Sequence, residues 1–160
     1  MVEDKIKSRS GLIKTIRTLK KRGKKIVFTN GCFDVLHKGH VKLLEKAKSL
    51  GNVLVVAVNS DSSAKRIKGP TRPINNQTDR AIIVAALSSV DFVTFFDEPT
   101  PESLIKKLNP DVLVKGGDWK KEKIVGSAHV ESYGGKVYSI KLVKGYSTSG
   151  FIRQAIKRFK

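Results

Sequence analysis

Asn52-Val53-Leu54-Val55-Val56-Ala57-Val58 is the clearest strand-like stretch of the chain, with an unbroken apolar run from Val53 to Val58. A short apolar run without alternation is typical of a strand that is covered on both faces of a parallel sheet. Residues 41–50 before it carry apolar side chains at helical spacing, and the run at 25–29 before that helix is strand-like. This part of the chain therefore predicts a strand–helix–strand unit with parallel strands.

The same alternation continues along the chain. Strands are predicted at 25–29, 52–58, 92–96, 112–114 and 136–142. Helices are predicted at 11–22, 41–50, 78–87, 101–108 and 126–132, and from 148 to the end with Ser147 as N-cap; residues 65–73 are predicted to form a loop. This order predicts an α/β fold, a Rossmann-like three-layer sandwich with a five-stranded parallel sheet. We expect a single domain, 1–160, with a helix inside residues 1–23 packed on it.

Composition describes a water-soluble domain rather than a membrane protein. The chain has 160 residues, of which 39% are hydrophobic and 29% are charged. No run approaches the roughly 20 apolar residues that cross a bilayer, and the first residues lack the apolar core of a signal peptide. Cys32 is the one cysteine, which excludes an internal disulfide and favours the cytoplasm.

The net charge of +18 raises the question of nucleic-acid binding. Residues 1–25 hold ten Lys or Arg against two acids, and residues 136–160 hold seven against none. The 110 residues between them hold fifteen against twelve. Because the positive charge is mainly terminal, we interpret it as a solvated surface with some phosphate-binding residues, and expect neither a nucleic-acid nor a membrane partner.

His37-Lys38-Gly39-His40 lies between the first predicted strand and the helix that follows it. Imidazoles three residues apart lie on the same side of a helical turn. Gly39 has no Cβ, so a ligand can approach the backbone closely, and the free N–H groups of a helix N-terminus bind phosphate. The pattern indicates a polyphosphate site, although the Gly-rich fingerprints of dinucleotide and P-loop proteins are missing.

The stretch from Gly31 to His40, GCFDVLHKGH, resembles the signature of the cytidylyltransferase-like nucleotidyltransferases. Further family-like motifs are Val58-Asn59-Ser60-Asp61, residues 68–73, Asp79-Arg80, residues 115–119 and residues 145–149. The resemblance covers roughly residues 22–160. The segment 114–118, VKGGD, is most similar to the branch of this family that adenylylates heptose 1-phosphate.

The resemblance implies a role for each motif. His37 and His40 would be the catalytic residues, which bind the triphosphate and stabilise charge at the α-phosphorus. The implied nucleotide-binding residues are Asn30, Gly31, Cys32, Phe33, Gly39, Lys115, Gly116, Gly117, Asp118, Ser147, Thr148 and Ser149. The implied residues for the acceptor or the leaving pyrophosphate are Asp34, Lys68, Arg72 and Arg80.

Simpler interpretations of these residues remain open in the sequence. The histidines can be helix caps, Asp34 can form a turn, and Ser147 can be an ordinary N-cap. The basic loop around Lys68 can be solvated, and Trp119 either covers a nucleotide or packs in the core. A protein-held metal site is not expected, because zinc needs more ligands than Cys32 and the two histidines supply.

The implied reaction transfers AMP from ATP to a sugar 1-phosphate, heptose 1-phosphate, and releases pyrophosphate, which yields ADP-heptose for lipopolysaccharide core synthesis. Mg²⁺ would be carried mainly by the nucleotide. The resemblance also implies a homodimer, and a transferase without the sugar kinase that is fused to many relatives. The rival hypotheses are a CTP-dependent cytidylyltransferase of glycerol 3-phosphate or a phosphoalcohol, an FMN adenylyltransferase, and a non-catalytic basic nucleic-acid-binding module.

Overall fold

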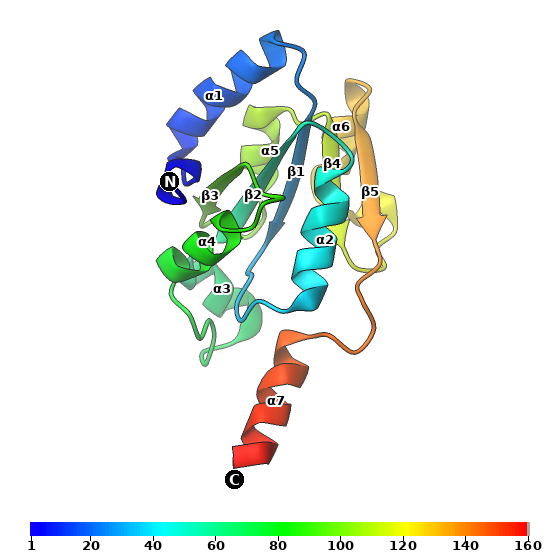
Figure 1. The fold of residues 1–160 in the computed structure, drawn as a ribbon. Coiled ribbons are helices and arrows are strands. Elements are labelled where there is room, and N and C mark those ends of the chain that lie inside the picture. Colours follow the sequence, from blue (N-terminus) through cyan, green and yellow to red (C-terminus); the bar gives the residue numbers. More distant parts are fainter. Residues whose placement is uncertain (160) are drawn as a thin grey trace.

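Five parallel strands form a central sheet in the order β3-β2-β1-β4-β5 in the computed structural model, which describes residues 1–159 (Figure 1). The strands are β1 (Ile26–Gly31), β2 (Val53–Asn59), β3 (Phe92–Phe96), β4 (Val112–Gly116) and β5 (Lys136–Ile140). All seven residues of β2 are buried, as its unbroken apolar run predicts.

Seven α-helices connect or flank the strands within residues 1–159. They are α1 (Arg9–Lys21), α2 (Lys38–Lys48), α3 (Asp61–Lys68), α4 (Gln77–Ala85), α5 (Glu102–Leu108), α6 (Ser127–Ser132) and α7 (Thr148–Phe159). Two short 3₁₀ helices, η1 (Glu3–Lys5) and η2 (Lys121–Lys123), complete the described elements.

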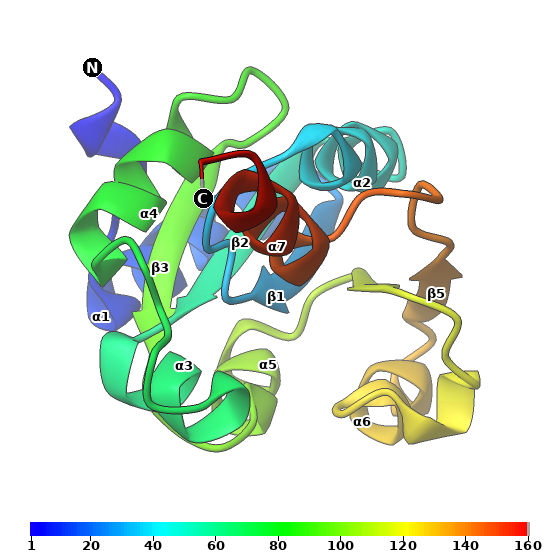
Figure 2. The ribbon, with the colours of Figure 1, turned by 90° about the horizontal axis from the view of Figure 1, so that it is seen from below.

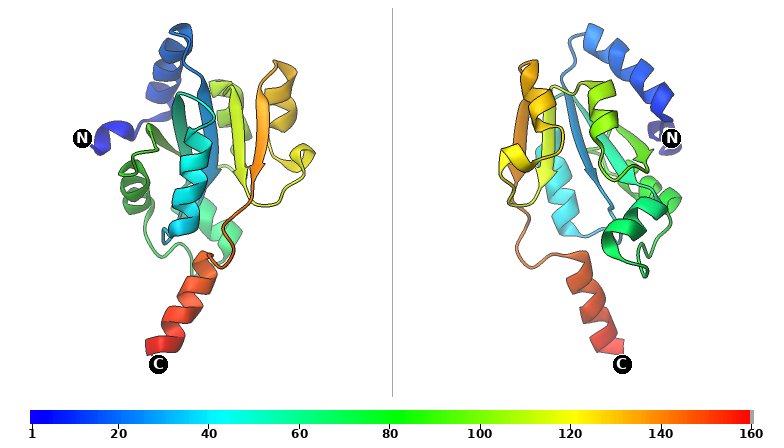
Figure 3. Two further views of the ribbon diagram at one scale, coloured as in Figure 1. Left: turned by 45° about the vertical axis from the view of Figure 1, so that its right-hand side comes forward. Right: turned by 180° about the vertical axis from the view of Figure 1, so that it is seen from behind.

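The core consists of two apolar layers, one on each face of the sheet. Figure 3 shows the helices that lie on the two faces. Successive strand residues point to opposite faces, so Val27 belongs to one layer and Phe28 to the other. Helices α2 and α4 cover the first layer, whereas α1, α5 and α6 cover the second. Leu12 and Ile16 of α1 are buried in that second layer. The predicted three-layer α/β arrangement with a parallel sheet is thus confirmed.

The strand order reverses at β1, which pairs with β2 on one side and with β4 on the other. The connection after β1 leads to α2 on one face of the sheet, and the connection after β4 leads to α6 on the other face. Open α/β sheets bind ligands in the crevice at such a point. Figure 2 shows the molecule from this end of the sheet, with α7 projecting in front of it. The fold therefore predicts a ligand-binding site at the loops after β1 and β4.

The predicted loop at 65–73 is wrong in its first half. Residues 65–68 belong to α3, which begins because the Ser60 side chain accepts a hydrogen bond from the N–H of Ser63, and which buries Ser63 and Ala64. The helix ends at Gly69, whose φ of 99° is in the left-handed region. Several other boundaries move by one to three residues; α2, for example, begins at Lys38.

No helix within residues 1–159 combines the length and the hydropathy that crossing a bilayer requires.

Candidate active site

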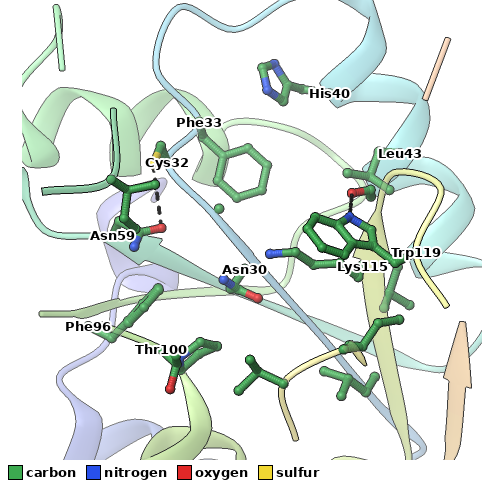
Figure 4. A pocket seen from close by; sticks show the side chains of 18 of the residues that line it. Asn30, Cys32, Phe33, His40, Leu43, Asn59, Phe96, Thr100, Lys115 and Trp119 are labelled. Carbon is green, nitrogen blue, oxygen red and sulfur yellow. Dashed lines mark hydrogen bonds between the residues drawn. The ribbon is translucent and has the colours of Figure 1, made fainter. Parts of the chain in front are cut away.

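A cavity of about 560 Å³ lies at the carboxyl ends of β1 and β4 (Figure 4). Most of its lining comes from the strand ends, from the loops after β1, β3 and β4, and from α2. The lining residues that are also predicted site residues are Asn30, Gly31, Cys32, Phe33, His40, Lys68, Lys115 and Gly116. The walls are mainly apolar with a few polar groups, which is the usual composition of a small-molecule site.

A second cavity of about 270 Å³ adjoins the first, because Cys32, Phe33, His40 and Lys68 line both. It contains most of the predicted phosphate-binding residues. Those that line only this cavity are Asp34, His37, Gly39, Arg72, Ser147, Thr148 and Ser149. The predicted phosphate motifs, which lie more than 100 residues apart in the sequence, are thus brought together.

The two histidines cap the N-terminus of α2 through their Nδ1 atoms. His37 Nδ1 accepts a hydrogen bond from the N–H of Gly39 at 3.1 Å, and His40 Nδ1 accepts one from the N–H of His37 at 3.3 Å. The rings stack with centroids 3.9 Å apart. A Cβ at position 39 would lie 2.9 Å from His37 Cε1, so the stacked pair requires glycine there.

These hydrogen bonds select the tautomer of both rings. A neutral imidazole carries one proton, and a ring nitrogen that accepts a hydrogen bond cannot hold it. The proton of each ring therefore resides on Nε2, which is left to donate to a ligand. The helix-cap interpretation of the histidines and the functional one are compatible, since one nitrogen of each ring caps and the other is available.

Burial keeps both rings neutral near pH 7. Burial lowers the pKa of His40 to about 4, with a further contribution from the neighbouring His37. Burial also lowers the pKa of His37. The pair therefore presents N–H dipoles to a ligand rather than two positive charges.

Ser147, Thr148 and Ser149 face the histidines from the start of α7. The Thr148 hydroxyl donates to the carbonyl oxygen of Asp34 at 2.9 Å, which joins the start of α7 to the loop after β1. Ser147 Oγ accepts from the N–H of Gly150 at 3.0 Å, so Ser147 is the N-cap that the sequence predicts. Tyr146 beside them lies with its ring 5.7 Å from Lys38 Nζ.

The loop after β4 forms one wall of the larger cavity. Figure 4 shows the Lys115 amino group pointing into this cavity, and burial lowers the pKa of that group. Trp119 Nε1 donates to the carbonyl oxygen of Gly116 at 3.1 Å, and the side chain is 49% exposed. Trp119 therefore lies at the rim of the cavity and not in the core.

Gly117 and Asp118, both predicted nucleotide-binding residues, line neither cavity. Gly117 has a φ of 127°, and a Cβ there would lie 2.5 Å from Trp119 Nε1. The glycine thus allows the tryptophan to fold over the loop. Asp118 is exposed to solvent.

Asp34 lines the smaller cavity, but its carboxylate oxygens are engaged by groups of the protein. The side chain is almost fully buried, and its oxygens accept hydrogen bonds from Arg72 Nε at 2.6 Å and from the N–H groups of Ile74 and Asn75. Burial acts to raise the pKa of Asp34, but the hydrogen bonds from Asn75, Ile74 and Arg72 outweigh it and lower the pKa. Asp34 holds the loop at 69–76, which carries Arg72 to the smaller cavity.

Arg80, also predicted to bind substrate, is not among the residues that line the two cavities. Its side chain is fully buried, and its guanidinium is hydrogen-bonded within the protein. Lys68 and Arg72 do line the smaller cavity. Of the four residues predicted to hold the acceptor or pyrophosphate, these two have cationic groups placed for it.

Several lining residues were not predicted. Asn59 at the end of β2 is buried, and its Nδ2 donates to Ser63 Oγ at 2.9 Å while its Oδ1 faces the Cys32 thiol. Burial raises the pKa of that thiol. Phe96 at the end of β3 and Thr100 after it also line the larger cavity. Asn59, Phe96 and Thr100 lie at or after the carboxyl ends of strands, and this position is the sequence signal that could have identified them.

The lowered pKa of His40 predicts a loss of stability in acid. Between about pH 4 and pH 6.5 the unfolded chain binds a proton at this histidine and the folded chain does not, so the free energy of unfolding falls as the pH falls. We expect the decrease in the free energy of unfolding between pH 7 and pH 4.5 to be about 1–3 kcal/mol smaller in His40→Gln than in the wild type. Denaturant unfolding at the two pH values measures it. His129→Gln, which changes a histidine outside both cavities, is the control. Equal pH dependence in the wild type and in His40→Gln would contradict the assignment.

Comparison with known proteins places the chain in a family. A model of the cytidylyltransferase-like family matches residues 28–154. The chain is 51% identical over 158 residues to the bifunctional protein HldE of Syntrophotalea carbinolica, and 54% identical over 155 residues to that of Geobacter metallireducens. These matches cover 99% and 97% of the chain but 32% of each relative, so the chain spans about a third of their length.

A solved structure agrees with this assignment. The lipopolysaccharide core biosynthesis protein from Thermoplasma volcanium is 29% identical and superposes with a TM-score of 0.63, covering 78% of this chain and 100% of that one. The segment that matches the family model contains both histidines, the loop after β4 and the start of α7. The resemblance seen in the sequence is confirmed: the chain belongs to the cytidylyltransferase-like family of nucleotidyltransferases.

Proposed function

We propose that this protein transfers AMP from ATP to heptose 1-phosphate, releasing pyrophosphate and forming ADP-heptose. The observation that carries the proposal is the pair of neutral imidazoles whose Nε2–H groups are left free beside two adjoining cavities. The choice of acceptor is supported by the similarity of segment 114–118 to the heptose-specific branch. It is also supported by the lipopolysaccharide core biosynthesis relative.

The proposed chemistry is a single in-line displacement. A phosphate oxygen of the acceptor forms a bond to the α-phosphorus of ATP while the bond from that phosphorus to the bridging oxygen breaks, and pyrophosphate leaves with the electron pair. The larger cavity would hold the nucleoside, with Lys115 near the phosphates. The smaller cavity, with Ser147–Ser149, Lys68 and Arg72, would hold the β- and γ-phosphates and the acceptor phosphate.

His37 and His40 would donate Nε2–H hydrogen bonds to the phosphate oxygens where negative charge increases. Donors that are fixed before the reaction stabilise such charge without reorganisation, and this is often the largest catalytic contribution. No nucleophile is needed from the protein. Burial raises the pKa of Cys32, which agrees with a role in the wall of the site and not as a thiolate.

The side chains of residues 1–159 supply few possible ligands for Mg²⁺ around the two cavities. Among residues 1–159, Asp34 is the only carboxylate that lines either cavity, and its oxygens already accept three hydrogen bonds. Within residues 1–159 no group of three or more His, Cys, Asp or Glu side chains is arranged to hold a metal ion. We propose that Mg²⁺ arrives with the nucleotide, held by phosphate oxygens and water. ATP and sugar phosphates are cytoplasmic metabolites, and we propose that compartment.

His40→Ala should reduce kcat by about 10²–10³-fold, because it removes one preorganised donor. The measurement is pyrophosphate release at saturating ATP and acceptor. His129→Ala is the matched control, since this histidine lies outside both cavities and bonds to Asn109. Wild-type turnover in His40→Ala would refute the proposed role.

A substrate panel tests the function itself. Pyrophosphate release is measured with ATP or CTP, each in the presence of heptose 1-phosphate, glycerol 3-phosphate, a phosphoalcohol or FMN. We expect turnover with ATP and heptose 1-phosphate to exceed every other pair. Preference for CTP would favour the cytidylyltransferase alternative. No turnover, together with salt-dependent binding of nucleic acid, would favour the basic binding module.

We also propose that the chain functions as a homodimer. Helix α7 projects from the body of the molecule (Figures 1 and 3), and none of its 12 residues is buried. Phe151, Ile156 and Phe159 are 56%, 52% and 91% exposed and share one face of the helix. A helix this short is marginal alone in water, so its apolar face needs a cover.

A second copy can supply this cover for both helices at once. The apolar face of α7 offers roughly 400 Å² of side chain. In a reciprocal contact each copy buries the apolar face of its own helix and the surface that receives the partner's helix. The total buried area then approaches the roughly 1,200–2,000 Å² of a stable interface.

Phe151→Ser combined with Ile156→Ser should therefore convert a dimer to a monomer, as measured by light scattering after size-exclusion chromatography. Arg153→Ser on the polar face of α7 is the control and should leave the dimer unchanged. A wild-type chain that is monomeric at about 10–100 μM, well above typical Kd values for stable dimers, would refute the proposal.

A further inference from the structure

The guanidinium of Arg80 connects four segments beneath the two cavities. Its Nε donates to the carbonyl oxygen of Asn75 at 2.9 Å, and Nη1 donates to that of Cys32. Nη2 donates to the carbonyl oxygen of Asn59 and to Asp61 Oδ1, at 2.9 and 2.8 Å. The four partners lie in the loop before α4, the loop after β1, the end of β2 and the first turn of α3.

Arg80 and the four segments that it binds form a junction, and the side chain at its centre is closed to solvent. Arg80 is 0% exposed and is the largest of the fully buried side chains within residues 1–159. A buried charge is tolerated only when it is paired and hydrogen-bonded, and here three backbone carbonyls and one carboxylate accept from four of the five N–H donors. A lysine has the same charge but one compact ammonium, which cannot reproduce the planar fork of donors.

Asp34 and Arg80 bind different backbone groups of the same loop. Asp34 accepts hydrogen bonds from the N–H groups of Ile74 and Asn75 and from Arg72, whereas Arg80 binds the carbonyl oxygen of Asn75. Arg80 also holds the carbonyl oxygen of Cys32, two residues before Asp34. The two side chains therefore fix the loop at 69–76 to the loop after β1.

We infer that Arg80 is a positioning residue for the transfer reaction: through the junction it sets the distance of Arg72 from the two histidines. The inference rests on the proposed function, because Arg72 and the histidines line the smaller cavity in which that function places the phosphates. A misplacement of about 1 Å in a group that orients a reactant can cost about 10²-fold in rate. Arg80 thus contributes to catalysis without touching a substrate.

The test compares Arg80→Lys with the wild type in two measurements. The first is hydrogen exchange of the Ile74 and Asn75 amides in the ligand-free protein, which we expect to be at least about tenfold faster in the variant because the loop is no longer held by both side chains. The second is kcat/KM for nucleotidyl transfer, which we expect to fall about 10²-fold. Circular dichroism and Tm establish that the variant is folded.

Two further variants complete the design. Asp61→Asn removes the carboxylate that pairs with Arg80, and should change both measurements in the same direction but less; it replaces Arg80→Lys if that variant does not fold. Arg66→Lys, on the exposed side of α3, is the matched control and should leave both unchanged.

Loss of transfer with unchanged amide exchange would overturn the inference, because it would mean a direct contact with substrate. Faster exchange with normal transfer would overturn it as well. If no substrate pair supports turnover in the wild type, the proposed function fails, whereas the exchange measurement still decides whether Arg80 holds the loop.

Discussion

Two backbone N–H groups at the N-terminus of α2, those of His37 and Gly39, determine what the histidine pair can do. Each donates to an Nδ1 atom, and this fixes the ring orientations, the tautomers and the stacking together. The neutral rings then offer hydrogen bonds without an excess of positive charge in the ligand-free site. Positive charge comes instead from Lys68, Lys115 and Arg72, on three other segments of the chain. Donors and cations are thus separated between a rigid helix end and the loops around it.

The parts of the structure that follow from local pattern were predictable. The unbroken apolar run at 53–58 indicates a doubly covered strand, and it is the fully buried β2. The helix spacing at 41–50 and the histidine motif before it predict a helix whose N-terminus faces the phosphate site, and α2 begins at Lys38. Each of these signals lies within a short stretch of sequence, so it can be interpreted without knowledge of distant contacts. The meeting of the histidines with residues 147–149 follows from the parallel order of the strands.

The roles of buried charges were not predictable from the sequence. Arg80 and Asp34 stand in family-like motifs, and the resemblance to the family implied contacts with the acceptor or the leaving pyrophosphate. Their real partners lie up to 48 and 41 residues away and are mostly backbone atoms, which no spacing rule identifies. Phe33 and Val35 adopt positive φ angles of 48° and 50°, although neither is glycine. Tertiary contacts impose that conformation on the loop after β1, and strain of this kind is concentrated at functional sites.

Trp119 is the only tryptophan in the chain, and it lies at the rim of the larger cavity. Its indole is tied to the loop after β4 through the carbonyl oxygen of Gly116, while half of its surface remains open to solvent. The tryptophan emission of the protein therefore originates at a single place beside the proposed nucleoside position. Occupancy of that cavity can be followed by fluorescence in the native sequence, with no added label.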